Sequence, residues 1–300
     1  AEVHVVLGLV YDSNLFEAAE DPQSGWVNRL HVSSSGYLAN RNRGHLRVRH
    51  QGGIKRFWDT ARDVAGGAGD VVANHLVTSG RVRASPRIDL FGSGSLKLKQ
   101  VTRVPGEESY LRAAADAGLA AALGKGLSGA IHYRIGADDA RDASLPEVSL
   151  RELGLEVRLR RSRRLTGRAG AVWRWLEYDR PALQIGPGGQ ILVMSHSQSD
   201  LLREVTAGLL VYRGMLVRLT YSFLHNRSNS SGYGFRGHRF EVMVVRHLFS
   251  GVDGQVYVNL QTRNYEDLPV SIPGTASEAD EYEQSIIILK MSREVTSRWG

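Results

Sequence analysis

The chain has 300 residues, of which 42% are hydrophobic and 23% charged, with a formal net charge of +7 and no cysteine. This composition excludes wholesale disorder and collagen-like repeats, and the lack of cysteine excludes disulfides, iron–sulfur clusters and thiol catalysis. Mean hydropathy is −0.25, and no apolar run approaches the ~18–20 residues of a membrane-spanning helix, so a helical membrane protein is excluded. A membrane β-barrel is not excluded, because only every second residue of its strands faces lipid.

Alternation of apolar and polar residues, the period of a β-strand, recurs from one end of the chain to the other. It begins with Val3, Val5 and Leu7 and is clearest in residues 215–225 and 255–263. The segments run for roughly 10–14 residues, whereas ordinary globular strands have about 5–6. The alternation predicts fourteen strands with cores at 2–12, 26–39, 44–56, 70–83, 86–100, 109–123, 126–136, 148–161, 165–178, 200–212, 214–226, 237–249, 252–265 and 281–293.

The connections between these segments alternate in length. Short ones fall at 40–44, 84–85, 124–125, 162–164, 213 and 250–251. Long, polar ones fall at 13–25, 57–69, 101–108, 137–147, 179–199, 227–236 and 266–280. Short periplasmic turns and long extracellular loops are typical of an antiparallel up-and-down barrel of the bacterial outer membrane. We therefore expect one all-β transmembrane barrel domain over residues 1–300, with both termini on the periplasmic side.

The two ends of the chain carry further expectations. The start at Ala1-Glu2-Val3, without methionine and in a cysteine-free chain, favours a mature end after signal cleavage, with a trimmed chain as the alternative. The last residues, Trp299-Gly300, resemble a turn rather than a closing strand. Either the barrel closes after the fourteenth segment, or later strands are missing and the full count is sixteen.

A soluble sandwich would show the same alternation, because it also buries one face of each strand. Three observations favour the membrane. The strands match the ~9–11 residues that cross a bilayer at a tilt, and glycines occur inside them, which a curved sheet tolerates. Aromatic residues gather near segment ends, as an interfacial girdle requires, at Tyr11, Trp26, Phe57, Trp58, Tyr110, Trp173, Trp175, Tyr178, Tyr212, Tyr265, Tyr282 and Trp299.

Residues 111–124 are the one segment whose propensity favours a helix, with Gly124 as its C-cap. The alternation survives there, with Leu111, Ala113 and Ala115 on one side, and the flanking segments are strands. We therefore expect a strand.

The face opposite the apolar series is the expected lumen, which fourteen strands make too wide for side chains alone to fill. Cations outnumber anions there by more than two to one, and rings of arginine and lysine favour anions in a confined pore. The predicted pore-lining residues are Arg47, Arg49, Lys55, Arg87, Lys97, Lys99, Arg112, Arg134, Arg158, Arg174, Arg218, Arg239 and Arg263, with Arg160 and Arg168 in the same series.

Two other interpretations of these cations stay open. Lumen charges can pair across strands and merely stabilise the barrel, as Arg158 and Glu156 could do on one face. Arginines near the short turns can instead bind anionic lipid headgroups on the periplasmic side, namely Arg41, Arg43, Arg160, Arg161, Arg163 and Arg164.

The sequence offers no convincing catalytic, metal or cofactor site. Ser195-His196-Ser197 lies in the longest predicted loop, but a hydrolase triad also needs a residue that orients the histidine. No His, Asp or Glu cluster has metal-ligand spacing. Gly186-Pro187-Gly188-Gly189 lacks the lysine of a phosphate loop. We expect a non-enzyme without cofactor or metal.

The first segment and its exit contain Tyr11-Asp12-Ser13-Asn14-Leu15-Phe16. This stretch resembles the opening strand of a broad group of proteobacterial outer-membrane β-barrels, many of which are associated with exopolysaccharide or capsule export. The closing aromatic strand of that group is not evident in this chain. The resemblance implies an outer-membrane location, contact with membrane lipid and lipopolysaccharide, and a polysaccharide as one substrate class.

The leading functional hypothesis is an outer-membrane channel with a basic lumen that passes anionic solutes or exports an acidic polysaccharide, with no nucleic-acid partner. The alternative is a structural barrel that sheathes a partner, either a periplasmic export protein or a multihaem cytochrome. An outer-membrane lipid hydrolase using Ser197 ranks below both.

Overall fold

The computed structural model describes residues 2–12, 25–57, 70–102, 109–140, 147–249, 252–266 and 286–293. All fourteen predicted segments contain a strand within these ranges. The strands are β1 Glu2–Asp12, β2 Gly25–Arg41, β3 Gly44–Phe57, β4 Asp70–Ser85, β5 Ile88–Thr102, β6 Tyr110–Gly124, β7 Leu127–Ala140, β8 Val148–Arg160, β9 Leu165–Ile185, β10 Ile191–Tyr212, β11 Leu216–Ser228, β12 Phe235–Phe249, β13 Val252–Tyr265 and β14 Ile286–Arg293. Their order in the sheet follows the chain from β1 to β14.

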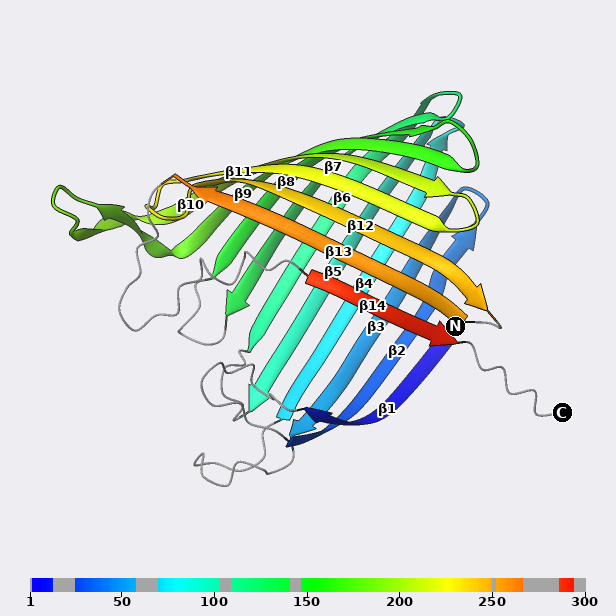
Figure 1. Cartoon of the computed structure of the whole chain (residues 1–300), viewed down its shortest axis with the longest axis horizontal. Helices are drawn as coiled ribbons and strands as arrows, with labels where there is room; N and C mark the ends of the chain where they lie inside the picture. The colour runs from blue at the N-terminus through cyan, green and yellow to red at the C-terminus, as the bar shows by residue number, and fades with distance from the viewer. Residues whose placement is uncertain are drawn as a thin grey trace. The chain divides into compact units, whose positions relative to one another are not determined.

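Two compact units make up the chain. The first comprises Ala1–Gly118 with Arg134–Leu150, and the second comprises Leu119–Tyr133 with Arg151–Gly300. Within the first, β1 to β5 pair antiparallel in succession, and within the second, β9 to β14 do the same (Figure 1). The described residues contain no helix long and apolar enough to cross a membrane.

The segment with helical propensity is a strand, β6, as its alternation predicts. The helix propensity of these residues does not decide their conformation, because pairing with the neighbouring strands does. Tertiary context commonly overrides a weak propensity in this way. The Asp116 carboxylate on β6 accepts a hydrogen bond from the Ser93 hydroxyl on β5, within the first unit.

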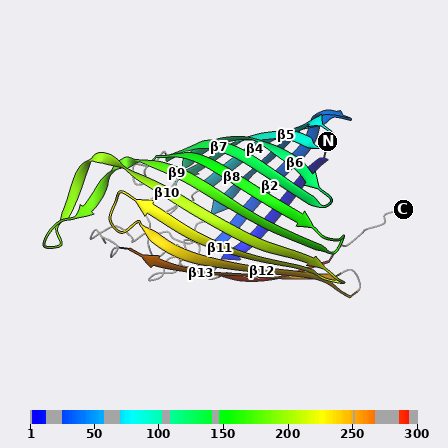
Figure 2. The same cartoon turned by 90° about the horizontal axis from the view of Figure 1, so that it is seen from above.

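The prediction for residues 179–199 is wrong. Instead of a long loop, β9 continues to Ile185 and β10 begins at Ile191, so that the two strands form one long hairpin. The register shifts on both sides of Ser197, and these irregularities interrupt the alternation that would have revealed the strands. The hairpin extends beyond the ends of β11 and β12 (Figure 2).

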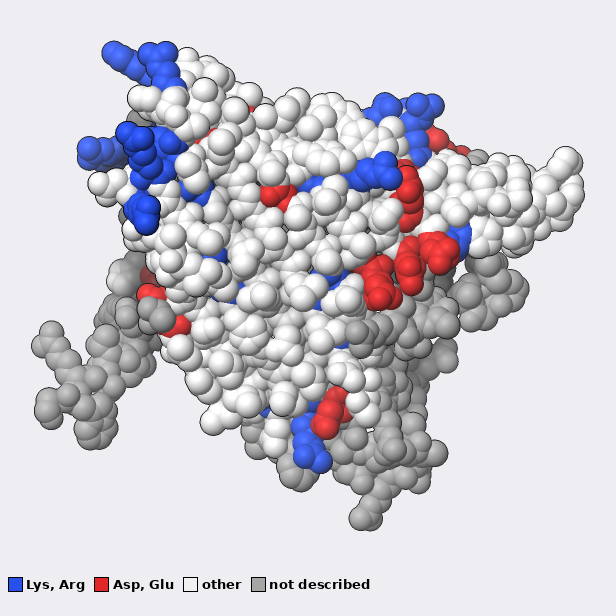
Figure 3. All heavy atoms as spheres, turned by 180° about the vertical axis from the view of Figure 1, so that it is seen from behind, with Lys and Arg blue, Asp and Glu red and all other residues white. Residues whose placement is uncertain are grey.

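Exposure is inverted relative to a soluble protein. The apolar face is open: Leu76 and Leu96 face each other across β4 and β5 at 41% and 47% exposure, and Phe240 and Leu260 do so across β12 and β13. The face in Figure 3 is largely free of charge over the middle of the strands. The buried side chains among the described residues are mostly polar: Glu152, Gln198, Asp200, Glu204, Thr220, Ser222, Asn226 and Ser230.

A sandwich would cover these leucines with a second sheet, whereas the described strands form one sheet. An apolar face of this extent is stable only against hydrocarbon, where every backbone polar group must be paired within the sheet. The alternation therefore separates a lipid-facing side of each strand from a polar side.

Candidate functional site on the polar face

In the first unit, the strand register brings cations of separate segments together on the polar face. Arg29 on β2 lies directly opposite Lys55 on β3. Residues that lie opposite one another across neighbouring strands form a row across the sheet. In the next row on this face, two residues further along each strand, His31 is opposite Gly53, Gly53 is opposite Ala73 on β4, and Ala73 is opposite Lys99 on β5. The next row continues with further side chains that can carry charge or donate hydrogen bonds, Gln51, His75 and Lys97.

This arrangement leaves two small residues, Gly53 and Ala73, between cationic neighbours. A side chain at Gly53 would place its Cβ 2.7 Å from the backbone oxygen of Leu30, so the position has no room for one. We name the surrounding set the basic surface; it comprises Arg29, His31, Arg47, Arg49, Lys55, His75, Lys97 and Lys99.

Few carboxylates lie on this part of the polar face. On the polar face of β2 to β5, the one acidic residue among those described is Asp89, and it pairs with Arg81 at 3.4 Å and Arg83 at 3.7 Å. Arg47 donates a hydrogen bond to the Ser35 hydroxyl at 3.1 Å and lies over the Tyr37 ring. Like charges placed opposite each other on a sheet repel, so the Arg29–Lys55 pair favours an anion between or above them.

Tyr110, at the start of β6, lies beside the edge of the basic surface. Its ring centroid is 5.1 Å from the Lys97 ammonium and 5.8 Å from that of Lys99. Arg112 lies over the same ring at 5.6 Å and pairs with Asp138 of β7, with 2.6 Å between Nη2 and Oδ2. The Tyr110 ring thus attracts both lysines by cation–π interaction.

In the second unit, two arginines of the polar face, Arg174 and Arg239, share a cluster of carboxylates. Arg174 of β9 contacts Glu152 of β8 at 2.5 Å and Glu204 of β10 at 3.3 Å. Arg239 of β12 contacts the other oxygen of Glu204 at 2.5 Å and Glu241 at 3.5 Å. Glu152 and Glu204 are buried, at 7% and 6% exposure. We name these five residues the charge network.

Other predicted pore-lining residues also fall on the polar face. Arg158 donates to Glu156 at 2.9 Å, Arg168 reaches across Gly208 to donate to the Thr220 hydroxyl at 2.9 Å, and Arg263 lies 4.7 Å from the Phe235 ring centroid. Arg134 and Arg218 share the face through their positions on β7 and β11, and neither forms an ion pair with a described residue.

Arg87 departs from the prediction. Because β4 continues to Ser85 and β5 begins at Ile88, the turn lies at 86–87 rather than 84–85, and Arg87 belongs to it. A turn residue has no assigned face of the sheet.

Three members of the basic surface, Arg29, His31 and His75, were absent from the predicted set. The signal for them was present, since Leu30 and Val32 alternate with Arg29 and His31. The polar sides of their strands, β2 and β4, also carry serine and apolar residues, so these series are less uniformly charged than that of β3.

The hydrolase candidate lies on β10 rather than in a loop. His196 is exposed, and within the described part of the chain no carboxylate pairs with it. Nor do the described ranges contain a group of three or more acidic and histidine side chains arranged to hold a metal ion.

Comparison with protein-family models and with curated proteins yields no match. Among solved structures, the siderophore receptor PirA from Acinetobacter baumannii matches 96% of this chain and 57% of its own, with 9% identity and a TM-score of 0.50. The ferric enterobactin receptor PfeA from Pseudomonas aeruginosa matches 86% of this chain and 44% of its own, with 14% identity and a TM-score of 0.45. A triple mutant of the Rhodopseudomonas blastica porin has 12% identity over 87% of this chain, with a TM-score of 0.27.

The chain thus spans about half the length of these two receptors. The likeness to PirA shows the fold. Together with the exposed apolar face and the antiparallel up-and-down strand order, it identifies an outer-membrane β-barrel in the bacterial outer membrane.

Proposed function

We propose that this chain forms the wall of an outer-membrane channel for anionic solutes, with an acidic polysaccharide as the favoured cargo. The observation that carries the proposal is the basic surface, where Arg29 and Lys55 are direct cross-strand neighbours. The charge network supports the same interpretation, because it neutralises Arg174 and Arg239, whereas the ion pairs of the described residues include neither Arg29 nor Lys55.

The mechanism is passive. An anion that leaves bulk water loses part of its hydration, and several lysines and arginines along the wall offset that loss. The cations occupy successive rows, from Lys55 through Lys99 to Lys97, and then Arg49 and Arg47. Many weak sites in sequence keep release fast, whereas one tight site would trap the solute. A linear polyanion suits such a series, because neighbouring charges along it can meet neighbouring rows.

The test is ion selectivity of the full chain in planar lipid bilayers. Wild-type protein should pass chloride in preference to potassium under a potassium chloride gradient. Replacing Arg29, Arg49, Lys55 and Lys97 by glutamine should lower the local anion concentration, and with it the anion preference, by about tenfold. Arg56→Gln is the matched control, since Arg56 follows Lys55 but lies on the opposite face and pairs with Asp70.

Cargo is tested in the same bilayers. An acidic polysaccharide such as polygalacturonate should block the wild-type current at concentrations where a neutral dextran of equal length does not. Equal permeability to both ions in wild type, or the same loss of selectivity in Arg56→Gln, would refute the proposal. A chain that inserts but conducts nothing would favour a structural barrel around a partner.

A further inference from the structure

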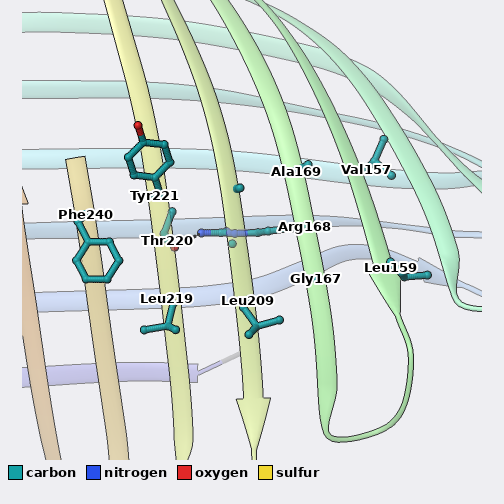
Figure 4. A pocket seen from close by; sticks show the side chains of 12 residues that line it. Val157, Leu159, Gly167, Arg168, Ala169, Leu209, Leu219, Thr220, Tyr221 and Phe240 are labelled. Atoms are coloured by element: carbon teal, nitrogen blue, oxygen red, sulfur yellow. Dashed lines mark hydrogen bonds between the residues drawn. The ribbon is translucent and has the colours of Figure 1, made fainter. Parts of the chain in front are cut away.

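The lipid-facing side of the second unit has a groove of about 470 Å³. Its floor is made by Gly167 and Ala169 of β9 and Ala207 of β10, with Ala169 directly opposite Ala207. Figure 4 shows larger apolar side chains on either side of this floor. They are Val157 and Leu159 on β8, Leu209 on β10, Leu219 and Tyr221 on β11, and Phe240 on β12. The volume is within the ~300–1,000 Å³ of ordinary ligand sites.

One end of the groove lies beside two short turns. Leu159 and Gly167 flank the β8–β9 turn (Figure 4). The β10–β11 turn is its neighbour, because the Tyr212 amide donates to the Arg164 carbonyl at 2.8 Å. At about 3.3 Å per strand residue, the three residues from Gly167 to Arg164 place that turn roughly 10 Å from the groove floor.

These turns form an uncompensated basic rim. Arg161, Arg163 and Arg164 lie in or beside the first turn and Arg213 in the second, and all four are exposed. No Asp or Glu occurs from residue 157 to 176 or from 205 to 240. Within the described residues none of the four forms an ion pair, so their charge is available to a ligand.

We propose that this groove and rim bind an anionic glycerophospholipid of the leaflet at the short-turn end, such as phosphatidylglycerol. The groove takes an acyl chain, and the arginines bind the phosphate by charge-assisted hydrogen bonds. The site faces hydrocarbon, where lipid is the surrounding solvent, and its apolar floor ends at a cationic rim, which matches a molecule with an apolar chain and an anionic head. The attraction of several basic residues near a membrane surface toward anionic lipid adds up.

The first unit offers a matched control. Its short turns carry Arg41, Arg43 and Arg87, and on the adjoining lipid face the exposed side chains of Val82 and Leu90 lie opposite each other between these turns and Gly80 and Gly92. Non-specific attraction would act equally at both sets of turns, whereas a built site would act only where groove and rim coincide.

The experiment is native mass spectrometry of the full chain in a neutral detergent, titrated with phosphatidylglycerol and, separately, phosphatidylcholine. Wild type should retain one phosphatidylglycerol in preference to phosphatidylcholine. The triple change Arg161→Gln, Arg163→Gln and Arg164→Gln should weaken that binding by about tenfold or more, and the triple change Arg41→Gln, Arg43→Gln and Arg87→Gln should not.

Substitutions that fill the groove test whether it binds the acyl chain of the lipid. Ala169→Leu with Ala207→Leu should also abolish the preferred adduct, whereas Ala171→Leu, on the same face of β9 but outside the groove, should leave it. Circular dichroism checks the folding of each variant, and the turn substitutions alone decide the result should the leucine pair not fold. Equal binding of both lipids, or equal losses in the two arginine triples, would overturn the proposal.

Discussion

Individual charged residues on the polar face differ mainly in whether a partner lies within reach. Glu204 is buried and contacts two arginines, Arg174 and Arg239, and it also accepts a weaker hydrogen bond from Thr206 at 3.4 Å. A buried carboxylate is costly unless paired, and removing one charge of such a cluster leaves the others uncompensated. Exposed cations such as Arg49 do not carry this free-energy cost, since water and mobile anions solvate them.

Glu204→Gln should therefore lower the free energy of unfolding by about 2–4 kcal/mol, since Arg174 and Arg239 lose the buried carboxylate that they share and keep only Glu152 and Glu241 as partners. Chemical denaturation in phospholipid vesicles measures this difference. Glu156→Gln is the control, because its pair with Arg158 is exposed and contributes about 0–1 kcal/mol. Similar losses for both substitutions would show that the network is not a structural element of the barrel wall.

At the level of elements, the β9–β10 hairpin is held by polar contacts. Gln198 is 1% exposed, and its side-chain oxygen accepts a hydrogen bond from Arg180 Nε at 2.9 Å. The Arg180 guanidinium also lies over the rings of Tyr178 and Tyr233, at 5.2 and 4.9 Å. These contacts keep β9 and β10 extended where the sequence, with Pro181 and a run of polar residues, favours a loop.

Gln198→Ala should loosen this extension without affecting the rest of the sheet. The loss of the hydrogen bond from Arg180, together with the longer one that Gln198 donates to Asp200 at 3.3 Å, should cost about 1 kcal/mol and speed amide hydrogen exchange about fivefold over residues 180–199. Residues 201–212 should keep wild-type rates. Gln190→Ala, at the exposed tip of the hairpin, serves as the control; an equal increase there, or no increase in either variant, would contradict the role assigned to Gln198.

For the whole molecule, the decisive property is the separation of charge from hydrocarbon. Apolar side chains cover the lipid-facing side of the strands, and the buried side chains among the described residues are mostly polar. On the polar face, the basic surface gathers cations of β2 to β5. Fields from such a surface act on mobile ions over about one Debye length, which falls from roughly 10 Å at 0.1 M salt to about 3 Å at 1 M.

The anion preference proposed above should therefore weaken as salt rises. Reversal potentials measured at the same concentration ratio, first around 0.1 M and then around 1 M potassium chloride, should indicate selectivity that approaches equality of the two ions at the higher concentration. Selectivity that is independent of salt would instead indicate a narrow steric filter, to which the basic surface contributes little.

The sequence alone determined the strands and their two faces, because both follow from a period of two within each segment. It predicted β6 despite its helical propensity, and it separated the chosen cations of each strand from the apolar series; that these cations line a pore stays a prediction. It did not determine which cations are neutralised. Glu204 and Arg239 are 35 residues apart, and Glu152 and Arg174 are 22 apart, so their pairing depends on the register between strands.

The tertiary structure also decided the hairpin extension and the lipid-facing groove. The extension depends on side chains from β11 and the stretch that follows it, such as Asn226 and Tyr233. The groove depends on small residues of β9 and β10 that lie side by side between larger ones of β8, β11 and β12. The alternation of residues within one strand contains no information about which residues of other strands lie beside them. These neighbours are decided only when turns and bulges set how far each strand is shifted against the next.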